Sequence, residues 1–248
     1  MLSKLRKTLR PTKRMAHLAR YRLTELPYLL KRPAVGTAEW LIQREIAYGG
    51  YVSDVQRRKV SPFDRRSDLQ LKFGGMTGGD RMLHHGYARA YARYLRPFLK
   101  KRALTIVEFG ILRGTGLAMW CDLFPNARVI GFDIDLSHFR QNQASLEALG
   151  AFRQNTPEIW EYDQFIESSR FLADVLKGHT IDVAIDDGFH SSETILTTWR
   201  SVMPHLSSEF VYFIEDYAGL LDASGNAFAH CCCHADGELT VITNTSPT

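Results

Sequence analysis

Short apolar runs alternate with amphipathic segments through the second half of the chain. The apolar runs predict strands at residues 105–109, 128–133, 159–162, 181–185 and 210–214. The intervening segments predict helices near residues 115–124, 137–149, 168–177 and 192–206. Two final apolar runs, 227–233 and 239–243, predict a closing hairpin. We therefore expect an α/β fold, with a Rossmann-like, seven-stranded, mostly parallel sheet and helices on both faces.

The first part of the chain lacks this alternation. We expect residues 1–60 to form helical or irregular segments, which prolines interrupt. Residues 61–82 are rich in glycine and charged residues, which predicts a loop. We expect a helical, basic N-terminal extension over residues 1–60 and an α/β domain over residues 61–248. A helix before the first strand places Tyr91 and Tyr94 on one face, which predicts core packing.

Positive charge is concentrated in the N-terminal extension. Residues 1–44 hold eleven Lys or Arg against two acids, a balance of +9, whereas the whole chain carries +4. Leu2, Leu5 and Leu9 recur at helical spacing among these cations, so residues 1–22 could form an amphipathic helix that contacts an anionic membrane. The favoured interpretation is a solvated arm or a contact between copies of the chain in a homo-oligomer, with the membrane contact as the alternative.

Composition indicates a protein from a reducing compartment. Of the four cysteines, three are consecutive, at positions 231–233, which is not the spacing of a disulfide framework. No apolar run approaches the ~20 residues that a transmembrane helix needs, and the N-terminal residues are too basic for a secretory signal. We expect a cytoplasmic location, with peripheral membrane contact as the alternative.

A glycine-rich turn follows the first predicted strand. Gly110, Gly114 and Gly116 come directly after residues 105–109 and lead into a helical pattern, which is typical of backbone that approaches a ligand closely. The next strand ends at Asp133, 23 residues after Gly110, where an acid can bind the ribose of a nucleoside. The pattern lacks the Gly-x-Gly-x-x-Gly phosphate cradle, so it favours S-adenosylmethionine (SAM) over NAD.

Carboxylates gather after two neighbouring strands. The fourth predicted strand is followed by Asp186, Asp187 and His190, and the fifth by Glu215 and Asp216. So much negative charge is costly without a cation, and oxygen ligands favour Mg²⁺, with Ca²⁺ or Mn²⁺ as alternatives. A single acid of this kind would more often cap a helix. For the whole cluster a metal site is the better interpretation, and an imidazole, with an ordinary pKa of ~6.5, suits a general base.

Four segments of the chain resemble a known family. They are Val107 to Trp120, Gly131 to Asp135, Asp186 to His190 and Ile214 to Asp216. In these segments the chain resembles the class I SAM-dependent methyltransferases, and more narrowly the metal-dependent sugar O-methyltransferases of macrolide and glycoside biosynthesis, of the mycinamicin and macrocin type. The resemblance covers roughly residues 70–220, and the pairing of Asp-Asp-Gly-x-His with Ile-Glu-Asp is its most specific part.

The resemblance implies a role for each of these residues. Mg²⁺ would be bound by Asp187, Glu215 and Asp216, with His190 as the general base. The residues that would form the SAM pocket are Glu108, Gly110, Gly114, Asp133, Asp163 and Gln164. Among them, Asp133 would bind the ribose, and the last two would lie near the adenine.

The resemblance also implies a reaction. The chain would be a Mg²⁺-dependent O-methyltransferase that moves the SAM methyl group to a hydroxyl of a sugar, and its partner would be a small-molecule glycoside, either a natural product or a glycolipid. Two alternatives are a metal-independent SAM methyltransferase of small molecules and a membrane-docked binding module without turnover. A nucleic-acid substrate is not expected, because the sequence has no Asn/Asp-Pro-Pro-aromatic motif.

Overall fold

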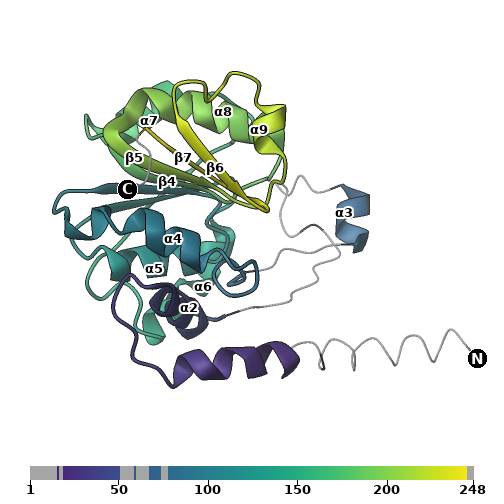
Figure 1. Cartoon of the computed structure of the whole chain (residues 1–248), viewed down its shortest axis with the longest axis vertical. Coiled ribbons are helices and arrows are strands. Elements are labelled where there is room, and N and C mark those ends of the chain that lie inside the picture. Colours follow the sequence, from purple (N-terminus) through teal and green to yellow (C-terminus); the bar gives the residue numbers. More distant parts are fainter. Residues whose placement is uncertain (1–15, 17–18, 51–58, 60–66, 74–77, 245–248) are drawn as a thin grey trace, which may run out of the picture. The chain divides into compact units, whose positions relative to one another are not determined.

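The computed structural model describes residues 16, 19–50, 59, 67–73 and 78–244. The chain divides into two compact units, Met1–Ala88 and Arg89–Thr248 (Figure 1). The boundary expected between residues 60 and 61 lies outside the described residues and stays a prediction. In the described part of the chain, no helix is both long and apolar enough to cross a bilayer.

The second unit is built on a seven-stranded mixed sheet, as the alternation of apolar and amphipathic segments predicted. Its strands are β1 (Thr105–Phe109), β2 (Arg128–Asp133), β3 (Glu158–Glu161), β4 (Ile181–Asp186), β5 (Leu206–Ile214), β6 (Cys232–Asp236) and β7 (Leu239–Thr243). Their order across the sheet is β3-β2-β1-β4-β5-β7-β6. The first five strands are parallel, and β7 runs antiparallel to both β5 and β6. The Rossmann-like prediction is therefore confirmed.

Helices cover both faces of this sheet. They are α4 (Ala88–Leu95), α5 (Thr115–Leu123), α6 (Ser137–Ala148), α7 (Ser169–Leu176), α8 (Ser192–Val202) and α9 (Leu220–Ala223). Figure 1 shows α4, α5 and α6 on one face and α7, α8 and α9 on the other. Side chains of a strand alternate between the faces, so both faces carry apolar cores. On the α8 face the ring of Trp199 stacks on Tyr212 at 5.7 Å between centroids, and on the α5 face Trp120 is almost fully buried.

The parallel register brings the carboxyl ends of the central strands to one edge of the sheet. Phe109 of β1 lies opposite both Phe132 of β2 and Asp186 of β4, and Asp186 lies opposite Ile214 of β5. The residues that follow these positions therefore leave the sheet along one edge, which is where open α/β sheets bind ligands.

Four predictions of element bounds are corrected by the structure. The strand expected over 210–214 is β5, which begins at Leu206, because Leu206 already pairs with Ile181 of β4 before a register shift. The helix expected over 192–206 ends at Val202, because Pro204 lies in a 3₁₀ turn over Met203–His205 and has no N–H to donate. The strand expected over 227–233 is β6, at Cys232–Asp236, because residues before it form turns in which the Ala227 carbonyl accepts from Trp199 Nε1. The loop expected over 61–82 contains a short helix, α3 (Asp68–Phe73).

The first unit is helical in its described part. Residues 19–29 form a helix, and α2 (Ala38–Ala47) begins after the N-cap Thr37, whose hydroxyl accepts from Trp40 N. The side chain of Gln43 in α2 ties the two helices together, because its Nε2 donates to the carbonyls of Tyr28 and Lys31.

A buried carboxylate joins α2 to the end of the first unit. Glu45 accepts hydrogen bonds from the backbone N–H groups of Met82 and Leu83. Burial raises the pKa of Glu45 to about 7, because a charged carboxylate is poorly solvated there.

Candidate active site

The glycine turn after β1 lies in direct contact with the turn after β4. Gly110 has φ +86°, and its N–H donates to the Phe132 carbonyl at 2.8 Å. A Cβ at this position would lie 2.1 Å from the Asp187 carbonyl oxygen and 2.6 Å from Gly188 Cα. Only glycine fits both the left-handed backbone and the close approach. Gly110 therefore lets the turn expected to bind SAM pack against the turn that carries Asp187.

Gly114 supports the same turn from the other side. It is the N-cap residue of α5, with φ +81°. A Cβ there would lie 2.4 Å from the ring of Phe139 in α6. The glycine therefore lets α5 begin directly against α6, and the first turn of α5 follows the glycine turn in the chain.

The carboxylate of Asp133 holds the glycine turn in place. Its Oδ2 accepts from the backbone N–H groups of Ile111 and Leu112, at 3.0 and 2.9 Å, and its Oδ1 accepts from Asp135 N at 3.1 Å. Burial raises the pKa of Asp133, and these three hydrogen bonds oppose the rise. Leu112 takes φ +42°, an uncommon conformation that the Asp133 bond supports. The ribose contact expected of Asp133 stays a prediction.

Glu108 lies beneath the same turn. Its side chain is almost completely buried, and its Oε2 accepts from Trp120 Nε1 at 3.1 Å. This bond pairs a carboxylate of β1 with an indole of α5, so both polar groups are satisfied inside the core. Glu108 therefore fixes α5 against β1, which sets the position of the glycine turn between them.

The pair expected near the adenine occupies the loop after β3. Asp163 Oδ1 accepts from Phe165 N at 3.0 Å. The Gln164 amide reaches the end of β4, because its Nε2 donates to Asp186 Oδ1 at 2.7 Å and its Oε1 accepts from Phe189 N at 3.1 Å. Sequence reasoning missed this bracing role, because the partners lie 22 and 25 residues further along the chain.

Asp186 is the buried anchor of the β4 end. Its Oδ1 accepts from the amide of Gln164, and its Oδ2 accepts from the hydroxyl of Tyr212 at 3.1 Å. Burial raises the pKa of Asp186, whereas its hydrogen bonds and the nearby His190 lower it. The capping role considered for this acid falls to Ser191, whose hydroxyl accepts from Thr194 N in a capping box.

Three of the residues expected to bind the metal or to accept the proton converge in the turns after β4 and β5. One ligand atom from each of Asp187, His190 and Asp216 lies within 4.8 Å of the other two. His190 Nε2 is 3.7 Å from Asp187 Oδ1. His190 Nδ1 lies 3.3 Å from the Glu215 carbonyl oxygen, so Nδ1–H donates there and Nε2 is the nitrogen that faces the carboxylates.

The two turns that carry these residues are both strained. His190 and Asp216 each have φ +56°, a left-handed conformation that non-glycine residues rarely adopt. Such conformations cost about 1–3 kcal/mol and persist where the surrounding structure holds them. Both occur within the cluster, and both aim a polar side chain at it.

Glu215 points toward a different partner. Its side chain is buried, and its Oε1 accepts a short hydrogen bond from the hydroxyl of Tyr91 in α4. The Tyr91 ring is stacked between Trp120, at 5.4 Å, and Phe213, at 4.0 Å. The sequence predicted Tyr91 as a core residue, which its burial confirms, but the contact of its hydroxyl with Glu215 was not foreseen.

The donor set of the cluster fits a hard divalent cation. Asp187 and Asp216 present carboxylate oxygens, which Mg²⁺ prefers. The metal contact expected of Glu215, the neighbour of Asp216 in the chain, stays a prediction. The imidazole of His190 is a poorer ligand for Mg²⁺ than for softer metals. Its position beside the carboxylates therefore suits a proton acceptor at the edge of a metal site.

Comparison with known proteins gives relatives for part of the chain. No family model matches it. It is 32% identical over 147 residues to the 8-demethyl-8-alpha-L-rhamnosyl tetracenomycin-C 2'-O-methyltransferase of Streptomyces olivaceus, a match that covers 56% of this chain and 35% of that protein. It is 32% identical over 140 residues to the L-olivosyl-oleandolide 3-O-methyltransferase of Streptomyces antibioticus, covering 53% and 32%. The chain thus spans about a third of the length of these relatives.

A solved structure shares the fold. The MycE methyltransferase of the mycinamycin biosynthetic pathway, in complex with Mg, SAH and mycinamycin VI, aligns with a TM-score of 0.50 and 22% identity, over 64% of this chain and 50% of that one. At this identity the likeness concerns the fold alone. Together, the curated relatives and this fold confirm that the chain resembles the class I SAM-dependent methyltransferases of the sugar O-methyltransferase type.

Proposed function

We propose that this protein is a Mg²⁺-dependent SAM O-methyltransferase that methylates a hydroxyl of a sugar in a small-molecule glycoside. One observation carries the proposal: the cluster of Asp187, His190 and Asp216 lies in backbone contact with the glycine turn, through Gly110. A methyl donor on that turn and an acceptor on the cluster would be neighbours. The curated sugar O-methyltransferases that match over half of this chain support the choice of acceptor class.

The donor half of the proposed site is the edge of β1 and β2. Gly110 and Gly114 let the turn after β1 pack closely against its neighbours, and α5 begins directly after Gly114. Asp133 would accept hydrogen bonds from the ribose hydroxyls. The three hydrogen bonds that it accepts from backbone N–H groups leave lone pairs of the carboxylate available for this. Asp163 and Gln164, in the loop after β3, would border the adenine.

The other half of the proposed site consists of the turns after β4 and β5 and would activate the sugar hydroxyl. Mg²⁺ held by Asp187, Glu215 and Asp216 would lower the pKa of a sugar hydroxyl, which is otherwise a poor nucleophile. His190 would accept the proton of the sugar hydroxyl at Nε2, and SAM, when bound, would supply the methyl group and leave as S-adenosylhomocysteine. The Nδ1–H bond to the Glu215 carbonyl fixes the tautomer in which Nε2 can do so. Positioning of the two substrates supplies much of the remaining acceleration.

The test is methyl transfer from labelled SAM to a panel of glycosides, with and without EDTA. We expect transfer that EDTA abolishes and added Mg²⁺ restores. Asp187→Asn should lower it at least about a hundredfold by weakening the metal site, and His190→Ala similarly by removing the base. The matched control is Asp174→Asn, an exposed acid on α7, which should leave transfer unchanged. Transfer that survives both EDTA and His190→Ala undiminished would refute the proposal and favour a metal-independent methyltransferase.

A further inference from the structure

The helix over residues 19–29 buries one face within the first unit. Tyr21 and Glu25 are buried, although Glu25 is a carboxylate. It forms an ion pair with Arg22 at 2.7 Å, and the ring of Tyr21 packs edge-on against His84 at 5.4 Å between centroids. The polar and aromatic side of this helix is therefore the side that contacts protein.

Leucines occupy the opposite side. Leu23, Leu26 and Leu30 are 66%, 50% and 87% exposed. Leu23 and Leu26 lie within the helix, and Leu30 is the turn residue that follows it. If the helical angle is continued at 3.6 residues per turn, the three positions fall within an arc of about 60°, on the side away from Tyr21 and Glu25. This inverts the usual arrangement of a surface helix, in which the leucines face the core. We call these three residues the leucine face.

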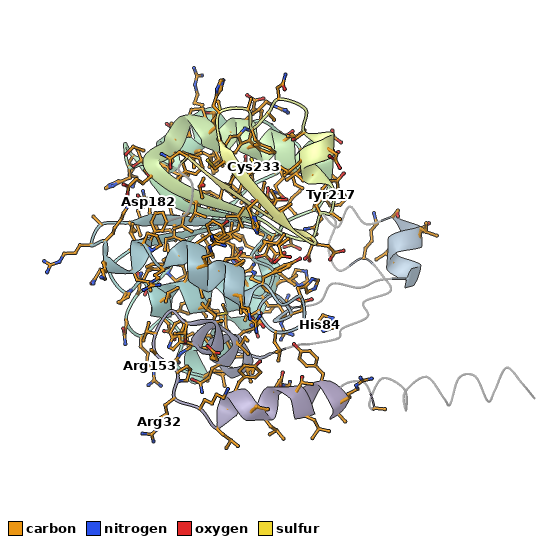
Figure 2. The ribbon with its side chains drawn as sticks, viewed as in Figure 1. Arg32, His84, Arg153, Asp182, Tyr217 and Cys233 are labelled. Carbon is orange, nitrogen blue, oxygen red and sulfur yellow. The ribbon has the colours of Figure 1, made fainter. Side chains whose placement is uncertain are left out.

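Cations surround the leucine face. Arg20 lies about 80° from its centre. Arg22 lies at a similar angle on the other side, but its guanidinium contacts the protein, because it pairs with Glu25 and donates to the Gly49 carbonyl. Lys31 and Arg32 follow at the end of the helix, and the Arg32 side chain extends away from the ribbon (Figure 2). The one acid between residues 19 and 35 is Glu25, which is buried and paired. The exposed surface of this segment is therefore apolar in the middle and positively charged at its borders.

The charge pattern decides between the possible occupants. A second copy of the chain would bring two clusters of cations together, and the leucine face offers roughly half of the 800 Å² per partner that a stable dimer buries. A membrane leaflet that contains anionic lipid can contact the leucines and the cations at the same time. Leucines enter the boundary between headgroups and acyl chains, while Arg20, Lys31 and Arg32 reach the phosphates.

We propose that residues 19–35 dock the protein on an anionic membrane surface, with the helix lying in the plane of the interface and the leucine face inserted. In the part of the chain that the structure describes, no helix is long and apolar enough to cross a bilayer, and the attachment that we propose is peripheral. This proposal does not depend on the proposed methyl transfer.

The test is flotation of the full chain with vesicles of phosphatidylcholine alone or mixed with phosphatidylglycerol. We expect binding to the mixed vesicles and little to the neutral ones. The variant with Leu23→Ser, Leu26→Ser and Leu30→Ser should reduce the partition coefficient at least about tenfold. These side chains are exposed, so circular dichroism and the unfolding midpoint should stay unchanged. The matched control is Leu149→Ser with Met203→Ser, two other exposed apolar residues, 56% and 51% exposed, and it should bind like the wild type.

Other outcomes would overturn the proposal. Equal binding to both kinds of vesicle would mean that anionic lipid is not recognised. Undiminished binding by the triple variant would mean that the leucine face is not inserted. Light scattering that shows a dimer, converted to monomer by the triple variant, together with no vesicle binding, would assign the leucine face to self-association instead. Methyl-transfer activity measured without vesicles is a separate readout, so failure of one proposal leaves the other intact.

Discussion

Replacing Gly110 by alanine should damage the structure at the point where the two halves of the site touch. The added Cβ would meet the Asp187 carbonyl oxygen at 2.1 Å and Gly188 Cα at 2.6 Å, and both obstacles are backbone atoms that cannot rotate away. The backbone would also be strained, because φ is +86°. Gly178 provides a matched control, since it has φ +84° and no atom within 4 Å of a Cβ.

The two glycines separate strain from steric conflict. A non-glycine residue in the left-handed region costs about 1–2 kcal/mol, and this is the whole expected loss for Gly178→Ala. Overpacking adds about 1–3 kcal/mol, so Gly110→Ala should lose roughly 2–5 kcal/mol in total. The reduced freedom of the unfolded chain is similar for both alanine variants and cancels in the comparison.

Urea unfolding measures this difference. Tryptophan fluorescence and circular dichroism should be followed together, because coincident transitions are needed before a free energy of unfolding is assigned. The Gly110→Ala protein should also bind Mg²⁺ more weakly, since the displaced turn carries Asp187. The free energies of unfolding of the two variants could instead differ by less than about 0.5 kcal/mol, the spread usual for neutral surface changes. That result would contradict the close contact between the two turns.

Three further changes address other parts of the site and its frame. Tyr91→Phe keeps the aromatic stack but removes the hydroxyl that donates to Glu215; a lost hydrogen bond to a charged group is worth about 1.5–3 kcal/mol, so Mg²⁺ affinity by calorimetry should fall at least about tenfold, and an unchanged titration would contradict this. Asp133→Asn weakens the hydrogen bonds that hold the glycine turn, and the affinity for SAM should fall about tenfold. An affinity equal to that of the wild type would show that Asp133 does not contribute to SAM binding. The Arg128 guanidinium, which forms two hydrogen bonds to Glu158, holds the pKa of that carboxyl below its ordinary value. This pair therefore contributes stability above the ordinary glutamate pKa, and the contribution is lost as pH falls through the lowered one. Arg128→Leu also removes hydrogen bonds to the Val175 and Leu176 carbonyls, and that loss does not depend on pH. The ion pair should add about 1 kcal/mol to the cost at pH 7, because Glu158 is partly exposed, and less at pH 3; a constant difference would show that the ion pair contributes nothing.

The apolar pattern predicted most of the sheet because each strand is short and bounded by turn residues. β1, β2 and β7 have the bounds expected, and the α5 and α6 helices end within one residue of the prediction. The errors fell where long-range contacts outweigh local preference. In the sheet that the described residues form, β6 is an edge strand next to β7, so its start depends on that pairing and on the turn held by Trp199, not on the apolar run at 227–233.

The sequence by itself determined the residue types of the site and the edge of the sheet that carries them. Strand ends in a parallel sheet must meet at one edge, so the acids after β4 and β5 had to be neighbours. Only the tertiary structure decided which atoms face one another. It gathers Asp187, His190 and Asp216 and turns Glu215 toward Tyr91, which is 124 residues away in the chain. Such pairings depend on side-chain direction and on turns in left-handed conformation, and neither follows from the spacing of residues along the chain.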